Sequence, residues 1–160
     1  MVPSKALQQS VVLDDVEKAR VLLACPRDWG RLPEDGDPLL FRALANGTLA
    51  MVKLLHEHGA PMDQRSRRGW DGWDALLGGR RCHPALWDWF LAHGPDPLSR
   101  SSRSGLPLLH LVALHAPDHP QWALEVISLG GSWGEQDRWG RTVWEVLPLE
   151  CREVWEKLTW

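Results

Sequence analysis

Seven histidines are the side chains of this sequence that first raise the question of metal binding or general base catalysis. His115 and His119 are four residues apart, the spacing that places two ligands on one face of a helix. Pro117 and Pro120 interrupt any continuous helix there, and no third ligand stands at a zinc-site spacing. Three further histidines close expected helices, where a cationic side chain meets the last carbonyl groups favourably: His56, His58 and His93. We therefore expect no metal and no cofactor, and a polar loop around His115 and His119.

No motif of nucleophilic or phosphate chemistry accompanies the other reactive side chains. Cys25, Cys82 and Cys151 are far apart and form no Cys-x-x-Cys pair, so we expect small buried residues in a reducing compartment. Neither Gly-x-Ser-x-Gly nor a loop ending in Gly-Lys-Ser/Thr occurs. The sequence therefore predicts a protein that is not an enzyme.

Composition indicates one globular domain. Of the 160 residues 44% are hydrophobic and 24% charged, and the net charge of −3 argues against a nucleic-acid partner. No apolar stretch approaches 18 residues and the first ten residues lack the apolar core of a secretory signal, so we expect a cytoplasmic protein without a membrane partner.

Glycines recur along the chain at a nearly constant period. Gly36, Gly69, Gly105 and Gly140 are 33, 36 and 35 residues apart, and each opens a similar apolar phrase. A second set of glycines precedes the next opening glycine by 10 or 11 residues: Gly59, Gly94 and Gly130. Two series that recur together indicate an internal repeat.

Each repeat reads as two helices followed by a loop. The residues that can start the first helix, by capping free amides or by presetting the first turn, are Pro38, Asp71, Pro107 and Thr142. In the first repeat, apolar residues of the stretch 39–44 form one helical face and those of 49–55 a second. His58-Gly59 then reads as a left-handed helix stop. Because each repeat has one apolar side, the repeats must stack to bury it.

These phrases resemble the ankyrin repeat. The similarity is carried by Leu-Leu-His-Glu-His-Gly-Ala (54–60), Leu-Leu-His-Leu-Val-Ala (108–113) and the stretch 130–140, in which Asp137 precedes Gly140 as in the family's Asp-x-x-Gly. The resemblance covers residues 35–148 and places His110 at the family's structural histidine. No repeat has the full Thr-Pro-Leu-His tetrapeptide, and glycines weaken the second repeat: Gly72, Gly78 and Gly79.

The resemblance implies an all-α fold, an ankyrin-like solenoid of about five stacked helix-turn-helix units joined by hairpin-like loops. We expect a single domain over 1–160, made of an N-terminal cap (1–34), repeats (35–68, 69–104 and 105–139) and a C-terminal cap (140–160). The residues expected to bury the cap faces are Val12, Val16, Ala19 and Leu23 at one end, and Cys151, Val154, Trp155 and Leu158 at the other.

In ankyrin-like stacks the partner lies against a concave side formed by hairpin tips and first helices. Transferred by register, the partner-binding residues are Arg67, Arg68, Trp70, Arg103, Leu106, His115, Arg138, Trp139 and Arg141. Tryptophan and arginine are the types most enriched at binding hot spots. Of the 11 tryptophans we expect Trp70 and Trp139 to be exposed, Trp73 and Trp144 to be buried, and one of Trp87 and Trp89 to face outward.

The resulting functional hypothesis is a non-catalytic protein–protein interaction module, monomeric when free, whose folded partner bears an acidic or mixed patch. Its similarity to small stand-alone bacterial ankyrin-like proteins implies an immunity or antitoxin role, in which the chain inhibits a toxin or enzyme by occlusion. The alternative is an adaptor or scaffold subunit of a cytoplasmic complex without inhibitory action.

Overall fold

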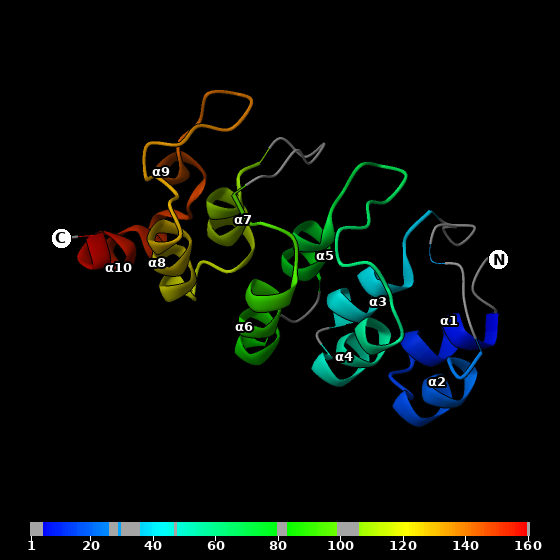
Figure 1. The fold of residues 1–160 in the computed structure, drawn as a ribbon. Helices are drawn as coiled ribbons and strands as arrows, with labels where there is room; N and C mark the ends of the chain where they lie inside the picture. The colour runs from blue at the N-terminus through cyan, green and yellow to red at the C-terminus, as the bar shows by residue number, and fades with distance from the viewer. Residues whose placement is uncertain are drawn as a thin grey trace. The chain divides into compact units, whose positions relative to one another are not determined.

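The structure of the chain, a computed structural model, describes residues 5–25, 29, 36–46, 48–79, 83–98 and 106–159. These residues form ten helices and no β-strand, apart from an isolated antiparallel bridge between Gln136 and Thr142. The all-α class is therefore confirmed. The chain divides into two compact units, Met1–Pro95 and Asp96–Trp160, which are described separately (Figure 1). None of the described helices is long and apolar enough to cross a membrane.

The first unit contains three successive helix pairs. They are α1 (Lys5–Val12) with α2 (Val16–Leu22), α3 (Leu39–Asn46) with α4 (Leu49–Glu57), and α5 (Gly72–Gly78) with α6 (Pro84–His93). The first helices of the pairs pack on one another, α1 on α3 and α3 on α5. The second helices do the same, α2 on α4 and α4 on α6. Each pair thus covers the apolar side of the next pair along the chain.

Aromatic rings fill the core between α5 and α6. Trp73 is fully buried, and its ring meets those of Phe90 and Trp87 edge-on, at centroid distances of 4.6 and 5.5 Å. Its Nε1 donates a hydrogen bond to the Pro95 carbonyl (3.2 Å). Edge-to-face pairs of this kind contribute about 0.5–1.5 kcal/mol beyond their area burial.

The second unit contains α7 (Leu108–His115), α8 (Pro120–Ser128), the short α9 (Val143–Val146) and α10 (Leu149–Thr159). Helix α7 packs on α8 and α9, and α8 packs on α10. Trp122 and Trp155 are buried, and Nε1 of Trp155 donates to the Pro117 carbonyl (2.8 Å). This hydrogen bond ties α10 to the turn between α7 and α8.

Several of the recurring glycines have a left-handed backbone, as the sequence predicts for Gly59, whereas Gly94 at the end of α6 has a φ of −82°. Gly36, Gly69 and Gly140 have φ values of +82°, +82° and +79°, and Gly59 ends α4 at +90°. Side chains are disfavoured in this left-handed region, which explains glycine at a recurring turn. Gly105 lies outside the described residues.

The first helix of the second repeat, α5, forms although its glycines lower the helix propensity of this segment. Asp71 caps α5 by accepting from the Asp74 amide (3.1 Å), and the Asp74 carboxylate accepts from the Asp71 amide (3.0 Å). Gly72 is buried, and a Cβ there would lie 2.6 Å from Cζ of Phe90. A Cβ on Gly79 would collide with the backbone of Ala45. These two glycines permit close packing in the first unit, a reason that helix propensity does not reveal.

Several burial predictions were wrong at the ends of the chain. Val12 is exposed because it ends α1, while Asp15 caps the separate helix α2. Of the face predicted for α10 only Trp155 is buried, and Val154 and Leu158 are exposed. Helix α10 packs on α8 among the described helices, so only a narrow strip of its surface is covered.

Two further expectations need correction. Cys25 is exposed just after α2, Cys151 is half-buried, and Cys82 lies outside the described residues. Trp144 is only half-buried and stacks on Trp133 at a centroid distance of 5.3 Å. Trp87 is fully buried whereas Trp89 is half-buried, in agreement with the prediction that one of the two faces outward.

Candidate functional site

Two loop tips contain six of the nine residues predicted to bind a partner. The first tip, residues 66–70, precedes α5 in the first unit. Its Ser66 Oγ accepts hydrogen bonds from the amides of Arg68 and Trp70, both at 3.2 Å. The Ser66 amide donates to the Trp70 carbonyl (2.9 Å), and the Gly69 amide donates to the Ser66 carbonyl (2.9 Å). The Ser66 side chain therefore accepts two of the hydrogen bonds that stabilise this turn.

The second tip, residues 137–141, precedes α9 in the second unit and has the same hydrogen-bond pattern. Oδ1 of Asp137 accepts from the amides of Trp139 and Arg141, both at 2.9 Å. The Asp137 amide donates to the Arg141 carbonyl (2.9 Å), and the Gly140 amide donates to the Asp137 carbonyl (3.0 Å). The two tips thus have one backbone design, with a hydroxyl as acceptor in one and a carboxylate in the other.

The first tip presents a half-covered indole among arginines. Trp70 is 41% exposed, and Cζ of Arg68 lies 5.5 Å from its ring centroid. Arg65 donates from Nη1 to the Gly69 carbonyl (3.4 Å), and the Arg67 amide donates to the Gly36 carbonyl (3.1 Å). The arginines Arg65, Arg67 and Arg68 are all exposed.

The second tip places two guanidinium groups close to its indole. Trp139 is 57% exposed, with Cζ of Arg138 and of Arg141 at 4.7 and 5.0 Å from its ring centroid. Nε of Arg141 also donates to Oδ2 of the buried Asp137 (2.8 Å). A cation over an exposed indole contributes about 0.5–1 kcal/mol, so both arginines have a reason to stay at the ring.

The buried carboxylate of Asp137 is the one negatively charged group of the second tip. Burial by itself would raise the pKa of Asp137, but the opposing effects are larger together. The hydrogen bonds from the Arg141 and Trp139 amides and from the Arg141 guanidinium, with the charge of Arg141, hold the pKa of Asp137 below its ordinary value. Asp137 is thus ionised at neutral pH and fixes the position of Arg141.

The remaining predicted residues do not belong to either tip. His115 is exposed and ends α7, and Leu106 is half-buried before α7. Arg103 lies outside the described residues.

Sequence reasoning missed Ser66 as an organising residue and saw Asp137 only as part of a family pattern. Both stand three residues before the left-handed glycine, and this shared offset was the signal that could have identified them.

His110 contacts the backbone of the second tip from the core. It is fully buried, and its Nε2–H donates to the Arg141 carbonyl at 2.8 Å. Within the described residues its buried Nδ1 has no hydrogen-bond partner.

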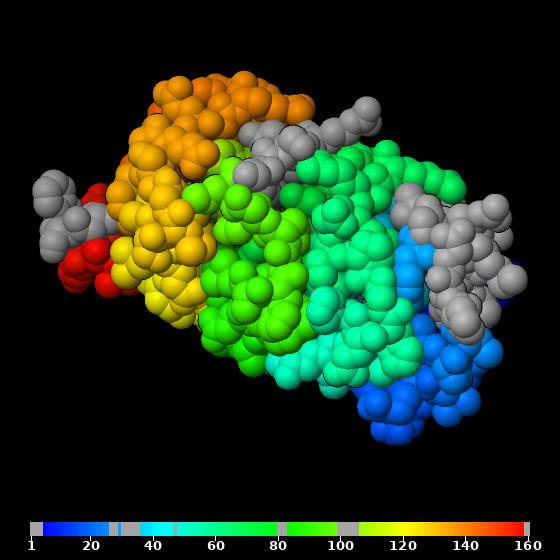
Figure 2. Space-filling view, in the orientation of Figure 1, coloured from blue at the N-terminus to red at the C-terminus, as the bar shows by residue number. Residues whose placement is uncertain are grey.

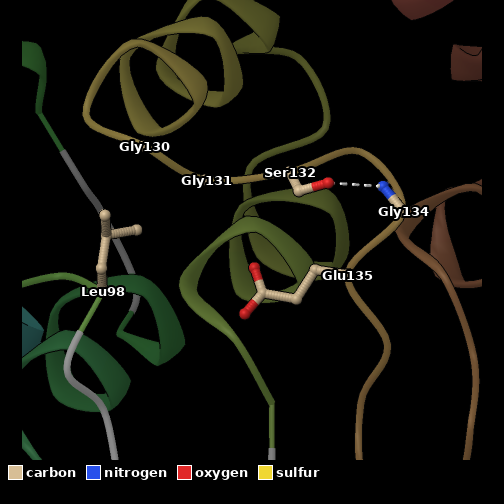
Figure 3. A pocket seen from close by; sticks show the side chains of 6 residues that line it. All are labelled: Leu98, Gly130, Gly131, Ser132, Gly134 and Glu135. Carbon is tan, nitrogen blue, oxygen red and sulfur yellow. Dashed lines mark hydrogen bonds between the residues drawn. The ribbon is translucent and has the colours of Figure 1, made fainter.

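An open pocket of about 490 Å³ lies beside the second tip within the second unit (Figure 3). Its lining residues are Leu98, Gly130, Gly131, Ser132, Gly134 and Glu135. Ser132 Oγ accepts from the Gly134 amide (3.2 Å), and Glu135 is the one charged side chain among the described lining residues. Among the described lining residues, no histidine, cysteine or second carboxylate accompanies Glu135.

The described residues contain no group of three or more histidine, cysteine, aspartate or glutamate side chains that could hold a metal ion. The tips present exposed indoles with guanidinium groups close to their rings, on turns closed by hydrogen bonds. No protein-family model matches this chain, and no curated protein matches it.

Proposed function

We propose that this chain is a non-catalytic binding module that engages a folded protein partner through its loop tips. The observation that carries the proposal is the recurrence of one tip design in both units. Two segments 71 residues apart fold with the same hydrogen bonds, and each presents an exposed indole with an arginine against its ring.

An ankyrin-like solenoid is part of this proposal. Its support is the packing of first helices on first helices and of second helices on second helices within each unit. The left-handed glycines at Gly36, Gly69 and Gly140 support it further, because they open the same turn at the predicted period. The loop tips of such a stack are its usual recognition surface.

The chemistry of the tips indicates the partner. Indole and guanidinium groups bury large area with few rotatable bonds, which is why they dominate interface hot spots. Here they are already held in place, so little side-chain freedom is lost on binding. The first tip contains two arginines with Arg65 beside it, and in the second tip Asp137 forms an ion pair with Arg141, so we expect the partner surface to be acidic or mixed.

The concrete form of the proposal is an immunity or antitoxin-type inhibitor that covers the working surface of a toxin or enzyme. This form of the proposal is supported by the resemblance to small bacterial ankyrin-like proteins, together with the exposed indole and guanidinium groups of the two tips. In this form of the proposal, the chain inhibits its partner by covering that surface and by no other mechanism.

The test is capture of partners with matched variants. The tip variant carries Arg68→Ala, Trp70→Ala, Arg138→Ala and Trp139→Ala, and leaves Ser66 and Asp137 intact. The control variant removes two exposed cations and two exposed apolar side chains elsewhere: Lys18→Ala, Lys53→Ala, Val21→Ala and Leu129→Ala. We expect one stoichiometric partner with the parent and the control, and none with a tip variant whose circular dichroism is native.

Retention of the partner by the folded tip variant would contradict the proposal. The purified complex then separates inhibitor from adaptor, because loss of the partner's activity at equimolar ratio identifies an inhibitor. Exposed charges are screened by salt, so we expect the affinity to fall modestly between 50 and 500 mM NaCl. A decline of several orders of magnitude would instead indicate a nucleic acid in the complex.

A further inference from the structure

A second cluster of aromatic and imidazole rings lies on the first unit, on α4 and α6. It consists of His56 on α4 and of Trp89 and His93 on α6. Figure 2 shows the surfaces of these two helices side by side, in agreement with their packing. The ring centroids of His56 and His93 are 5.8 Å apart, and that of Trp89 lies 5.4 Å from His56 and 4.4 Å from His93.

The protonation of His93 follows from its hydrogen bond. Its Nδ1 lies 2.9 Å from the Trp89 carbonyl oxygen, which can only accept, so Nδ1 carries the proton of the neutral ring. The lone pair is therefore on Nε2. The Trp89 indole stacks on the same ring at 15°, which restricts its rotation. An imidazole whose N–H is held by a carbonyl, leaving the other nitrogen bare, has the orientation typical of metal-ligating histidines.

His56 faces this ring from the neighbouring helix. Both histidines are exposed, and neither ring nitrogen of His56 has a hydrogen-bond partner among the described residues. A metal ion held at 2.0–2.1 Å by one nitrogen of each ring would place the ring centroids roughly 5 to 6 Å apart. The observed 5.8 Å falls within this range, so the two rings are close enough to share an ion once one nitrogen of each turns toward it.

We propose that His56 and His93 bind one divalent late transition-metal ion, of the class of Zn²⁺, Ni²⁺ and Cu²⁺, and thereby clip α4 to α6. Two neutral imidazoles suit these ions, and the Irving–Williams order places Cu²⁺ first in affinity. Water completes the coordination, since no third protein ligand stands near enough among the described residues. Neither histidine belongs to a loop tip.

The test is calorimetric titration of the full untagged chain with ZnCl₂, and separately with NiCl₂. The variants are His56→Gln and His93→Gln, and the controls are His83→Gln at the start of α6 and His58→Gln at the end of α4. We expect one ion per chain for the parent and both controls. Each of the other two variants should bind at least tenfold more weakly, because a single imidazole cannot chelate.

Fluorescence provides a second readout that does not depend on affinity alone. Cu²⁺ quenches an indole close to it, so one equivalent should quench the parent, and Trp89→Phe should lose most of this quenching while still binding Zn²⁺. The proposal is overturned if the parent binds no ion, if a folded His56→Gln or His93→Gln chain binds like the parent, or if a control loses binding equally. Circular dichroism of each variant excludes misfolding as the cause of a loss.

Discussion

Glycine has opposite roles at two positions of the same helix, α5. A Cβ on Gly72 would lie 2.6 Å from Cζ of Phe90 and 3.4 Å from Cδ1 of Leu44, whereas a Cβ on Gly78 meets nothing within 4 Å. Phe90 cannot retreat freely because the Trp73 ring is packed on it at 4.6 Å. The two glycines therefore differ in their surroundings rather than in their helix propensity.

Alanine substitution separates these roles. Gly78→Ala should stabilise the chain by about 0.5–1 kcal/mol, since helix propensity improves and no atom is displaced. Gly72→Ala should destabilise it by about 1–2 kcal/mol, because overpacking outweighs the same gain. Urea unfolding at neutral pH measures both. Equal signs for the two substitutions would contradict this account of the α5 packing.

At the scale of the element, the two tips form a natural comparison because only one of them contains a titrating group. Asp137 has a lowered pKa in the folded chain, so its contribution to stability is complete above its ordinary pKa of about 3.8 and is lost as the pH falls through the lower folded value. Ser66 holds the first tip with a hydroxyl that does not titrate.

Substitutions at these two residues should therefore differ in their pH dependence. The difference in unfolding free energy between the parent and Asp137→Asn should be largest at neutral pH and shrink as the pH falls below about 4. The difference for Ser66→Ala should stay constant over the same range, at about 1 kcal/mol for the loss of a buried acceptor of two amides. Urea unfolding at pH 7 and pH 3 tests both. A pH-independent difference for Asp137→Asn would show that the carboxylate charge does not hold the tip.

The elements show how far sequence reasoning reaches and where it stops. The period of the opening glycines predicts the helix pairs, and His58-Gly59 predicts a left-handed helix end, because a positive φ restricts residue type locally. The need for glycine at Gly72 depends on Phe90, 18 residues later, and cannot be seen from propensity. Ser66 was missed for a similar reason: serine and aspartate look unrelated in sequence, although each supplies one acceptor oxygen at the same offset.

Exposure was the least predictable property of the end helices. Helical spacing placed Val154 and Leu158 with Trp155, yet α10, which packs on α8, buries Trp155 alone among its described residues. A helix face is buried only where a neighbour covers it, and the sequence of one helix does not state how many neighbours it has. The same limit applies to Trp144, which stacks on Trp133 instead of entering the core.

At the scale of the whole molecule, the division into Met1–Pro95 and Asp96–Trp160 has consequences for folding. Helices within each unit contact their neighbours along the chain, and stability in such chains is approximately a sum of local and nearest-neighbour terms. A loss of packing in one unit should then be felt mostly in that unit. The single domain expected from the sequence would instead unfold as one cooperative body.

Val126→Ala distinguishes these two behaviours. Val126 is 1% exposed on α8, so its truncation leaves a cavity and should cost about 1–3 kcal/mol. Under native conditions we expect amide hydrogen exchange, followed by mass spectrometry of peptides, to accelerate in α7, α8 and α10 and to change little in α1–α4. Leu129→Ala, on the exposed end of the same helix, is the matched control and should leave exchange unchanged. Equal acceleration in all helices would mean that the chain opens as one cooperative domain, because local losses would then reach every element.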